Sequence, residues 1–353
     1  PVASLLLVGM AIGPQGLSLL SPRVLSFLDP ALPVALAVLG ALVGLSVDVR
    51  ALGGRRALGG ALVESALTTG LVAAGIALLA PIVWPSTAAP LWVLASGLGL
   101  CAATSLTVPG GDPAEPPARD RRVVAVDVLD VLAPIVMGGL LLGAIPHGAT
   151  LAAITFVGQA VVIVVLLAAS AWLLLARATS DTEQRVFVFA AMLLVGGAAD
   201  YLLLSALMSG LVAGVFWRLA GGPAEASVRR DARYVQHSLL VLVLVVAGAR
   251  TEFTTTAFAI AAIYVFLRTA GKLLGGWAAA RMAGTDGDRA LAGHLLSPGV
   301  FGIAFALNLF RSGLPDATTL LSIVVLGTVG AELVAEIGRP LEAKSAEIVE
   351  AAD

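Results

Sequence analysis

Two aspartates interrupt an otherwise aliphatic stretch, VDVLDVLAPIV, at residues 126–136. Asp127 and Asp130 lie three positions apart, so they would share one face of a helix. A carboxylate is costly in such apolar surroundings, and each is therefore a candidate for binding a proton or, transiently, a metal cation. The alternative for Asp127 is an interfacial acid paired with a nearby arginine. For Asp130 it is a buried ion pair with Lys272.

Two basic residues stand in another apolar stretch of the chain. Lys272 and Arg268 are four positions apart, so they also share a helix face. Glu64 lies in a third apolar stretch and is a secondary candidate, as a supporting charge of the site; the alternative is a structural counter-ion of Lys272 or Arg268. Asp200 and Glu332 lie nearer to the ends of their stretches and are expected at the membrane interfaces.

Two further apolar stretches contain residues that interrupt a helix. CAATSLTVPGG, at 101–111, offers the hydroxyl groups of Thr104 and Ser105 just before its break, and HLLSPGVFG, at 294–302, is the other stretch. Hydroxyl and freed carbonyl oxygens are suitable ligands for a hard cation. The alternative is two ordinary proline kinks. The interrupting residues are Pro109 in the first stretch and Ser297, Pro298 and Gly299 in the second.

The composition indicates an all-α polytopic membrane protein. Of the 353 residues 59% are hydrophobic and 12% are charged, and the mean hydropathy is +0.99. One cysteine and three scattered histidines provide neither a disulfide framework nor a zinc site. There is no nucleophile–base arrangement and no phosphate-binding loop. We therefore expect no enzymatic activity, no cofactor and no nucleic-acid partner, with membrane lipid around the protein.

Apolar runs separated by proline, glycine or charge predict about twelve transmembrane helices. The fourth and the eleventh carry the two interruptions and are seven spans apart, so they run in opposite directions. Paired interruptions of this kind are typical of inverted-repeat transporters. The approximate ranges are 1–19, 32–48, 57–80, 90–109, 123–143, 149–176, 186–203, 205–217, 235–250, 255–281, 289–310 and 318–337.

Basic residues divide unequally between the two sets of loops that these spans create. One set, together with the C-terminal tail, holds sixteen, whereas the other holds only Arg23, Arg250 and Arg311. The positive-inside rule then predicts a cytoplasmic C-terminus. Arginine outnumbers lysine 19 to 2 in a chain rich in alanine and glycine, which favours a bacterial source. We expect a multi-pass protein of the bacterial inner (plasma) membrane.

Several segments, in their order along the chain, resemble those of bacterial monovalent cation/proton antiporters, the family of sodium/proton exchangers and potassium-efflux systems. PVASLLLVGMAIGPQGLSLL is similar to the family's opening glycine–proline segment, and LGALVGLSVDVRAL is similar to its second span. CAATSLTV resembles the broken fourth span, and LDVLAPIV resembles the carboxylate motif of the fifth. Later matches are SALMSGLVAGVF, VVAGARTEF and TAGKLLGGWAAARMAG.

This resemblance implies an antiporter-like fold in which two broken helices cross beside an ion-binding aspartate. It implies a homodimer with a possible separate cytoplasmic regulatory subunit. It also implies exchange of Na⁺ or K⁺ for H⁺ by alternating access, and this exchange would serve pH homeostasis. Members of the family usually carry one more helix before the opening segment, so the resemblance implies that this N-terminal helix is missing here. The implied division is 1–48 and 186–217 for dimerisation panel helices, 57–176 and 235–337 for the two halves of a core domain, and 338–353 for a cytoplasmic tail.

The resemblance also assigns roles to single residues. Asp130 takes the place of the family's ion-binding carboxylate, and Lys272 takes that of its tenth-span lysine. The position before the aspartate, commonly Asp, Asn or Gln in the family, is Leu129 here, so Lys272 is left to pair with Asp127, Asp130 or Glu64. One carboxylate that trades one proton for one cation predicts electroneutral exchange.

Two alternative functions stay open on the same fold. The first is an uncoupled or gated potassium-efflux pathway. The second is a transport-inactive structural or sensory homologue, suggested by Leu129 and by Val300, which stands where many members of the family have Glu.

Overall fold

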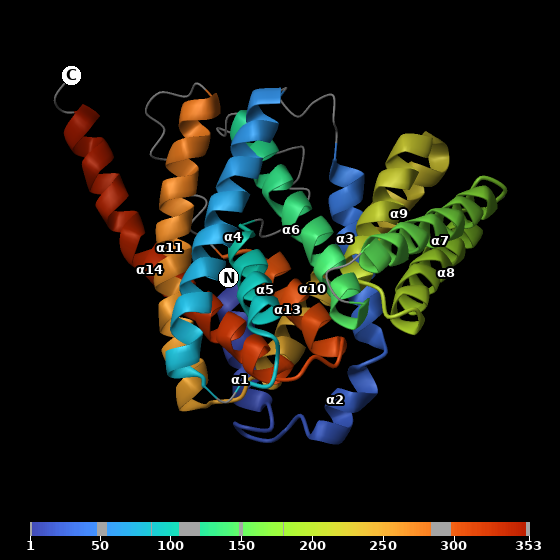
Figure 1. The fold of residues 1–353 in the computed structure, drawn as a ribbon. Helices are drawn as coiled ribbons and strands as arrows, with labels where there is room; N and C mark the ends of the chain where they lie inside the picture. Colours follow the sequence, from blue (N-terminus) through green and yellow to red (C-terminus); the bar gives the residue numbers. More distant parts are fainter. Residues whose placement is uncertain are drawn as a thin grey trace.

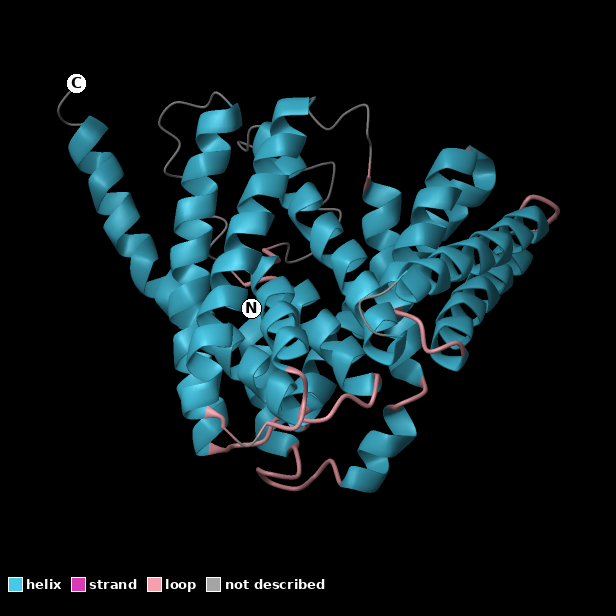
Figure 2. Ribbon diagram, viewed as in Figure 1, coloured by secondary structure: helices cyan, strands magenta, loops and turns pink. Residues whose placement is uncertain are grey.

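The computed structural model describes residues 2–47, 55–85, 87–105, 121–147, 151–178, 180–283 and 298–350. Within these ranges the side chains of 55–58, 121–129, 147, 223, 283 and 337–350 lie outside the description. The described residues form thirteen α-helices and no strand, which confirms the predicted all-α class (Figure 2). The helices are α1 Val2–Ile12, α2 Pro22–Leu28, α3 Ala31–Ser46, α4 Arg55–Val83, α5 Leu91–Ala103, α6 Arg121–His147, α7 Leu151–Leu175, α8 Asp181–Tyr201, α9 Ala206–Ala220, α10 Gly222–Ala249, α11 Thr255–Ala283, α13 Val300–Arg311 and α14 Ala317–Glu350.

Apolar helices of membrane-spanning length account for much of the described chain. Six are long and apolar enough to cross a bilayer, and a seventh span results if α2 and α3, bent by 47° at their junction, are taken together. Five shorter apolar segments lie in α1, α5, α6, α9 and α13. Each of the twelve predicted ranges thus holds one apolar helix, while the number of complete spans stays a prediction.

The helices form two groups that are joined along α6 (Figure 1). In one group α4 packs lengthwise against α11 and α5, and α14 packs against α11 and α13. In the other, α3 packs against α9, α8 and α10, and α7 lies against α8 and α9. Because α6 contacts both α4 and α7, it links the groups. The predicted division into panel and core stays a prediction.

Small residues allow α3 and α9 to approach closely. A Cβ atom added at Gly40 or Gly44 would overlap the backbone of α9, and one added at Gly210 or Gly214 would overlap the backbone of α3. Membrane helices gain little from burying apolar surface against each other, so close van der Waals contact through small residues stabilises such a pair.

The two interrupted stretches meet inside the first group. Helix α5 ends at Ala103, and its cap Thr104 has extended backbone, as does Gly299 just before α13. The Gly299 amide donates a hydrogen bond to the Thr104 carbonyl oxygen at 3.4 Å. Pro298 is buried beside this contact. The C-terminus of α5 therefore lies directly against the N-terminus of α13, while Pro109 and Ser297 lie outside the described residues.

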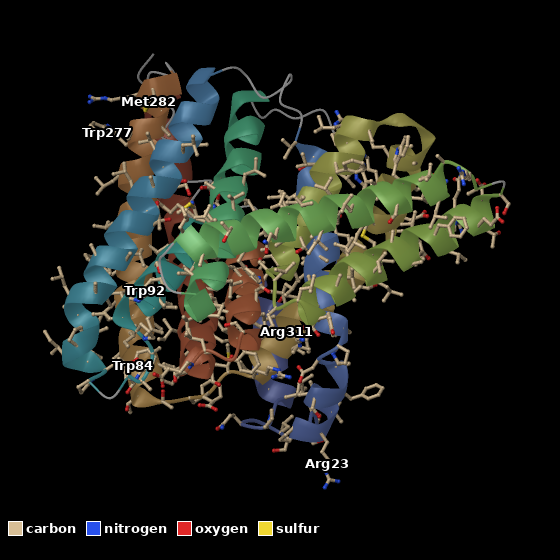
Figure 3. All side chains as sticks on the ribbon, turned by 45° about the vertical axis from the view of Figure 1, so that its right-hand side comes forward. Arg23, Trp84, Trp92, Trp277, Met282 and Arg311 are labelled. Carbon is tan, nitrogen blue, oxygen red and sulfur yellow. The ribbon has the colours of Figure 1, made fainter. Side chains whose placement is uncertain are left out.

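Ion pairs tie the far end of α13 to the second group. Arg311, in its last turn and labelled in Figure 3, pairs with Asp200 of α8 and donates to the Asp29 carbonyl oxygen at 2.7 Å. Arg250, which caps α10, pairs with the Asp29 carboxylate.

A separate contact joins α14 to α1, where Glu332 accepts a hydrogen bond from the Ala3 amide at 2.6 Å.

Two half-exposed tryptophans lie toward helix ends, Trp92 at the start of α5 and Trp277 near the end of α11, and tryptophan is common at membrane interfaces. Figure 3 shows Trp277 near one end of the molecule and Trp92 about midway along it. Both are half-exposed, at 57% and 47%. The guanidinium carbon of Arg281 lies over the Trp277 ring, 4.0 Å from the ring centroid. These positions agree with helices that cross a bilayer.

The close contact between α5 and α13 depends on Gly302. A Cβ atom there would lie 2.5 Å from the Cys101 carbonyl oxygen and 3.0 Å from the Thr104 hydroxyl. Gly302→Ala should force the two helix ends apart and lower stability by about 1–3 kcal/mol, the usual cost of overpacking. The measurement is the melting temperature of the detergent-purified protein. Gly158→Ala, where no atom lies within 4 Å of the new Cβ, is the matched control, and an unchanged melting temperature for Gly302→Ala would contradict the close contact.

Candidate functional site

Asp130 lies on α6 and is fully buried, with 0% of its surface exposed. Its Oδ2 atom accepts hydrogen bonds from the Ser105 amide at 3.1 Å and from the Ser105 hydroxyl at 2.6 Å. Ser105 is the second residue after α5 ends, where the extended backbone turns its N–H away from the helix. The helix break therefore supplies two of the donors that hold this carboxylate.

Lys272 supplies the third donor to Asp130 and connects it to a second acid. Its Nζ atom lies 2.9 Å from Asp130 Oδ2 and 2.9 Å from Glu64 Oε1, and all three side chains have 0% exposure. The ammonium also donates to the Ala103 carbonyl oxygen at the end of α5. An ammonium has three N–H donors, so these partners satisfy all of them.

Close packing of α4 on α11 brings Glu64 to this ammonium. A Cβ atom at Gly275 would lie 3.1 Å from Glu64 Cα, and one at Gly271 would lie 3.0 Å from Thr68 Cα. These two glycines flank Lys272 on the surface of α11 that faces α4. Thr68 in turn donates its hydroxyl to Glu64 Oε1 at 3.1 Å. The small residues of the GKLLGG segment thus position the second carboxylate.

Arg268 adds a second buried positive charge one helical turn from Lys272. It is 2% exposed, and its Nη2 atom donates to the Thr104 carbonyl oxygen at 3.3 Å. The last carbonyls of a helix have no partner within the helix and form the negative end of its dipole. Lys272 and Arg268 satisfy two such carbonyls at the broken end of α5. Among the described side chains, the cluster therefore contains two carboxylates and two cationic groups.

Each carboxylate keeps one oxygen without a hydrogen bond among the described atoms. These oxygens are Asp130 Oδ1 and Glu64 Oε2, and both are buried. Buried polar atoms are usually satisfied, so exceptions in a charged cluster need a chemical explanation. A carboxylate oxygen of this kind can take up a proton or coordinate a cation. Near Asp130, the Ser105 hydroxyl and the carbonyls of Ala103 and Thr104 provide further oxygen atoms.

Several of the predicted site residues come together here. Asp130, Ser105, Lys272 and Glu64 form one connected cluster, and the pair between Asp130 and Lys272 that the sequence left open is present. Thr104 takes part through its backbone, because its hydroxyl donates to the Cys101 carbonyl oxygen at 3.3 Å.

Other predicted residues lie apart from this cluster or outside the description. The side chain of Asp127 lies outside the described residues, as do Pro109 and Ser297. Pro298 and Gly299 adjoin the cluster through the contact between Gly299 and Thr104. The sequence analysis did not indicate Ala103, which takes part through its carbonyl oxygen. The predicted helix break was the feature that could have indicated a free carbonyl at this position.

Comparisons with known proteins identify the fold. No protein-family model matches the sequence, and no curated protein matches it either. The structure is similar to that of the sodium proton antiporter MjNhaP1 from Methanocaldococcus jannaschii at pH 8, with a TM-score of 0.65 and 16% identity over 95% of this chain and 91% of that one. An electron-microscopy structure of MjNhaP1 gives a TM-score of 0.66 at 16% identity, over 98% and 89% of the two chains. The protein therefore has the fold of a sodium/proton antiporter, which confirms the predicted fold class.

Proposed function

We propose that this protein is a secondary active transporter that exchanges a monovalent cation, Na⁺ or K⁺, for protons at Asp130. The observation that carries the proposal is a fully buried carboxylate whose Oδ1 atom has no hydrogen bond among the described atoms, placed where two interrupted helices meet. Similarity to MjNhaP1, which is named as a sodium proton antiporter, supports it.

The surroundings of Asp130 suit competition between a proton and a cation. A hard monovalent ion prefers oxygen ligands, and the Asp130 carboxylate and the Ser105 hydroxyl offer them beside the carbonyls of Ala103 and Thr104. Protonation neutralises the carboxylate and removes the charge that attracts the cation. Asp130 therefore holds either a proton or a cation, but not both. This exclusion couples the two fluxes.

Transport also requires that Asp130 reach water on each side of the membrane in turn. In proteins built from inverted repeats with broken helices, one group of helices rocks against the other around a fixed site. Here α4, α5, α11, α13 and α14 would move with Asp130 relative to α3, α8 and α9. The proposal includes a homodimer in a bacterial inner membrane with a cytoplasmic C-terminus, and a possible separate regulatory subunit.

Removing the charge of Asp130 tests the proposed site. Asp130→Asn should abolish exchange, because an amide can take up neither the proton nor the cation's charge. The measurement is a pH-dye assay in everted membrane vesicles with pulses of Na⁺, K⁺ and Li⁺. Glu332→Gln, which changes a partly buried acid of α14 outside the cluster, is the matched control and should retain exchange.

Three results of this assay would contradict the proposal. Exchange that persists in Asp130→Asn would place the reaction elsewhere. A wild-type protein that moves none of the three cations would indicate the transport-inactive homologue. Uptake of radiolabelled cation into the same vesicles with no dye response would indicate the uncoupled potassium pathway.

Exchange at one carboxylate is expected to be electroneutral, with one proton moved for each cation. In proteoliposomes on a solid-supported membrane, a jump in cation concentration should then give no transient current, although a pH dye reports exchange in the same preparation. A current that scales with the exchange rate would show net charge movement and refute this stoichiometry.

A further inference from the structure

We infer that Glu64 is a positioning residue that retains the ammonium of Lys272 while a cation occupies Asp130. This inference rests on the proposed exchange at Asp130 and adds a step to it. The ammonium touches both carboxylates in the present structure, at 2.9 Å from each. When the cation takes the Asp130 carboxylate, the ammonium withdraws from Oδ2 and remains on Glu64.

The geometry gives the ammonium a second carboxylate without a large movement. Glu64 comes from α4 and Asp130 from α6, so the Lys272 side chain lies between two acids on different helices. Glu64 Oε1 already accepts from Lys272, and Oε2 is buried without a hydrogen bond among the described atoms. The N–H that leaves Asp130 can therefore be accepted by Oε2. The ammonium keeps its charge and its three acceptors.

Contacts that do not involve Asp130 also hold Glu64 in position. The Thr68 hydroxyl donates to Oε1 at 3.1 Å, and Gly275 allows α11 to lie against the Glu64 backbone. These two contacts can persist whichever ion Asp130 carries. Arg268 donates to the Thr104 carbonyl oxygen.

The charge balance explains why such a residue is needed. A cation that binds Asp130 competes with an ammonium already hydrogen-bonded to it, and an ammonium displaced into a water-poor interior without a partner is strongly disfavoured. With Glu64 present, the displaced ammonium keeps an ion pair. Without Glu64, cation binding must break the last ion pair that Lys272 forms among the described residues. The apparent affinity for the cation should then fall on the order of 100-fold.

Four proteins form the test: the wild type, Glu64→Gln, Lys272→Gln and the double variant. Cation-dependent exchange is measured in proteoliposomes, and the KM for the cation is compared. Glu64→Gln should raise KM on the order of 100-fold. Lys272→Gln removes the competing ammonium, so in that background Glu64→Gln should leave KM nearly unchanged. Glu332→Gln should behave as the wild type.

Two results would overturn the inference while leaving the proposed function intact. An unchanged KM in Glu64→Gln would reduce Glu64 to a structural counter-ion. An equal rise in KM with and without Lys272 would make Glu64 a direct ligand of the cation. Absence of exchange in the wild type would instead refute the proposed function, and this inference with it.

A milder variant keeps the test decisive if Glu64→Gln does not fold. Glu64→Asp retains the charge but withdraws it from Lys272 by one methylene group. Glu64→Asp should raise KM by a smaller factor than Glu64→Gln does. In the Lys272→Gln background, Glu64→Asp should leave KM nearly unchanged. No rise in Glu64→Asp, in a protein that elutes as a single species, would overturn the inference.

Discussion

A buried ammonium must keep its counter-ions, and this constraint organises the centre of the molecule. Lys272 projects from α11 and bonds a carboxylate on α4, a carboxylate on α6 and a backbone carbonyl at the end of α5. One nitrogen atom therefore joins four helices. Replacing either acid by a neutral residue would leave the described cluster with excess positive charge in a water-poor interior, so these helices are held in register around the site.

The helix break in α5 and the charged cluster depend on each other. A continuous helix would use the carbonyls of Ala103 and Thr104 and the amide of Ser105 internally, and none would be available to the site. Because α5 stops, these groups bond Lys272, Arg268 and Asp130. The charges in turn satisfy backbone groups that lipid could not satisfy. The irregular backbone and the buried charges therefore stabilise one another.

Charge in apolar stretches was enough to predict much of the site from the sequence. Asp130, Glu64 and Lys272 were each marked by their cost at that depth, and Ser105 by its place before a break. The choice of partners for Lys272 depends on how α4, α6 and α11 cross, and periodicity along one helix carries no such information. Thr104 was predicted through its hydroxyl but contributes a carbonyl, because backbone direction after a break cannot be inferred from residue type. The all-α class and the approximate positions of the apolar helices followed from hydropathy, but several helix ends did not: α1 ends at Ile12 and α10 begins at Gly222.

The central claim is that a cation and a proton compete for the Asp130 carboxylate. A hydrophobic carbodiimide reacts with a protonated buried carboxyl, and peptide mass spectrometry locates the adduct. In the purified wild-type protein, the account predicts that acidification increases the adduct at Asp130 and that the transported cation decreases it in a concentration-dependent way. An adduct at Asp130 that saturating Na⁺, K⁺ and Li⁺ all leave unchanged, in a preparation that catalyses exchange, would contradict it.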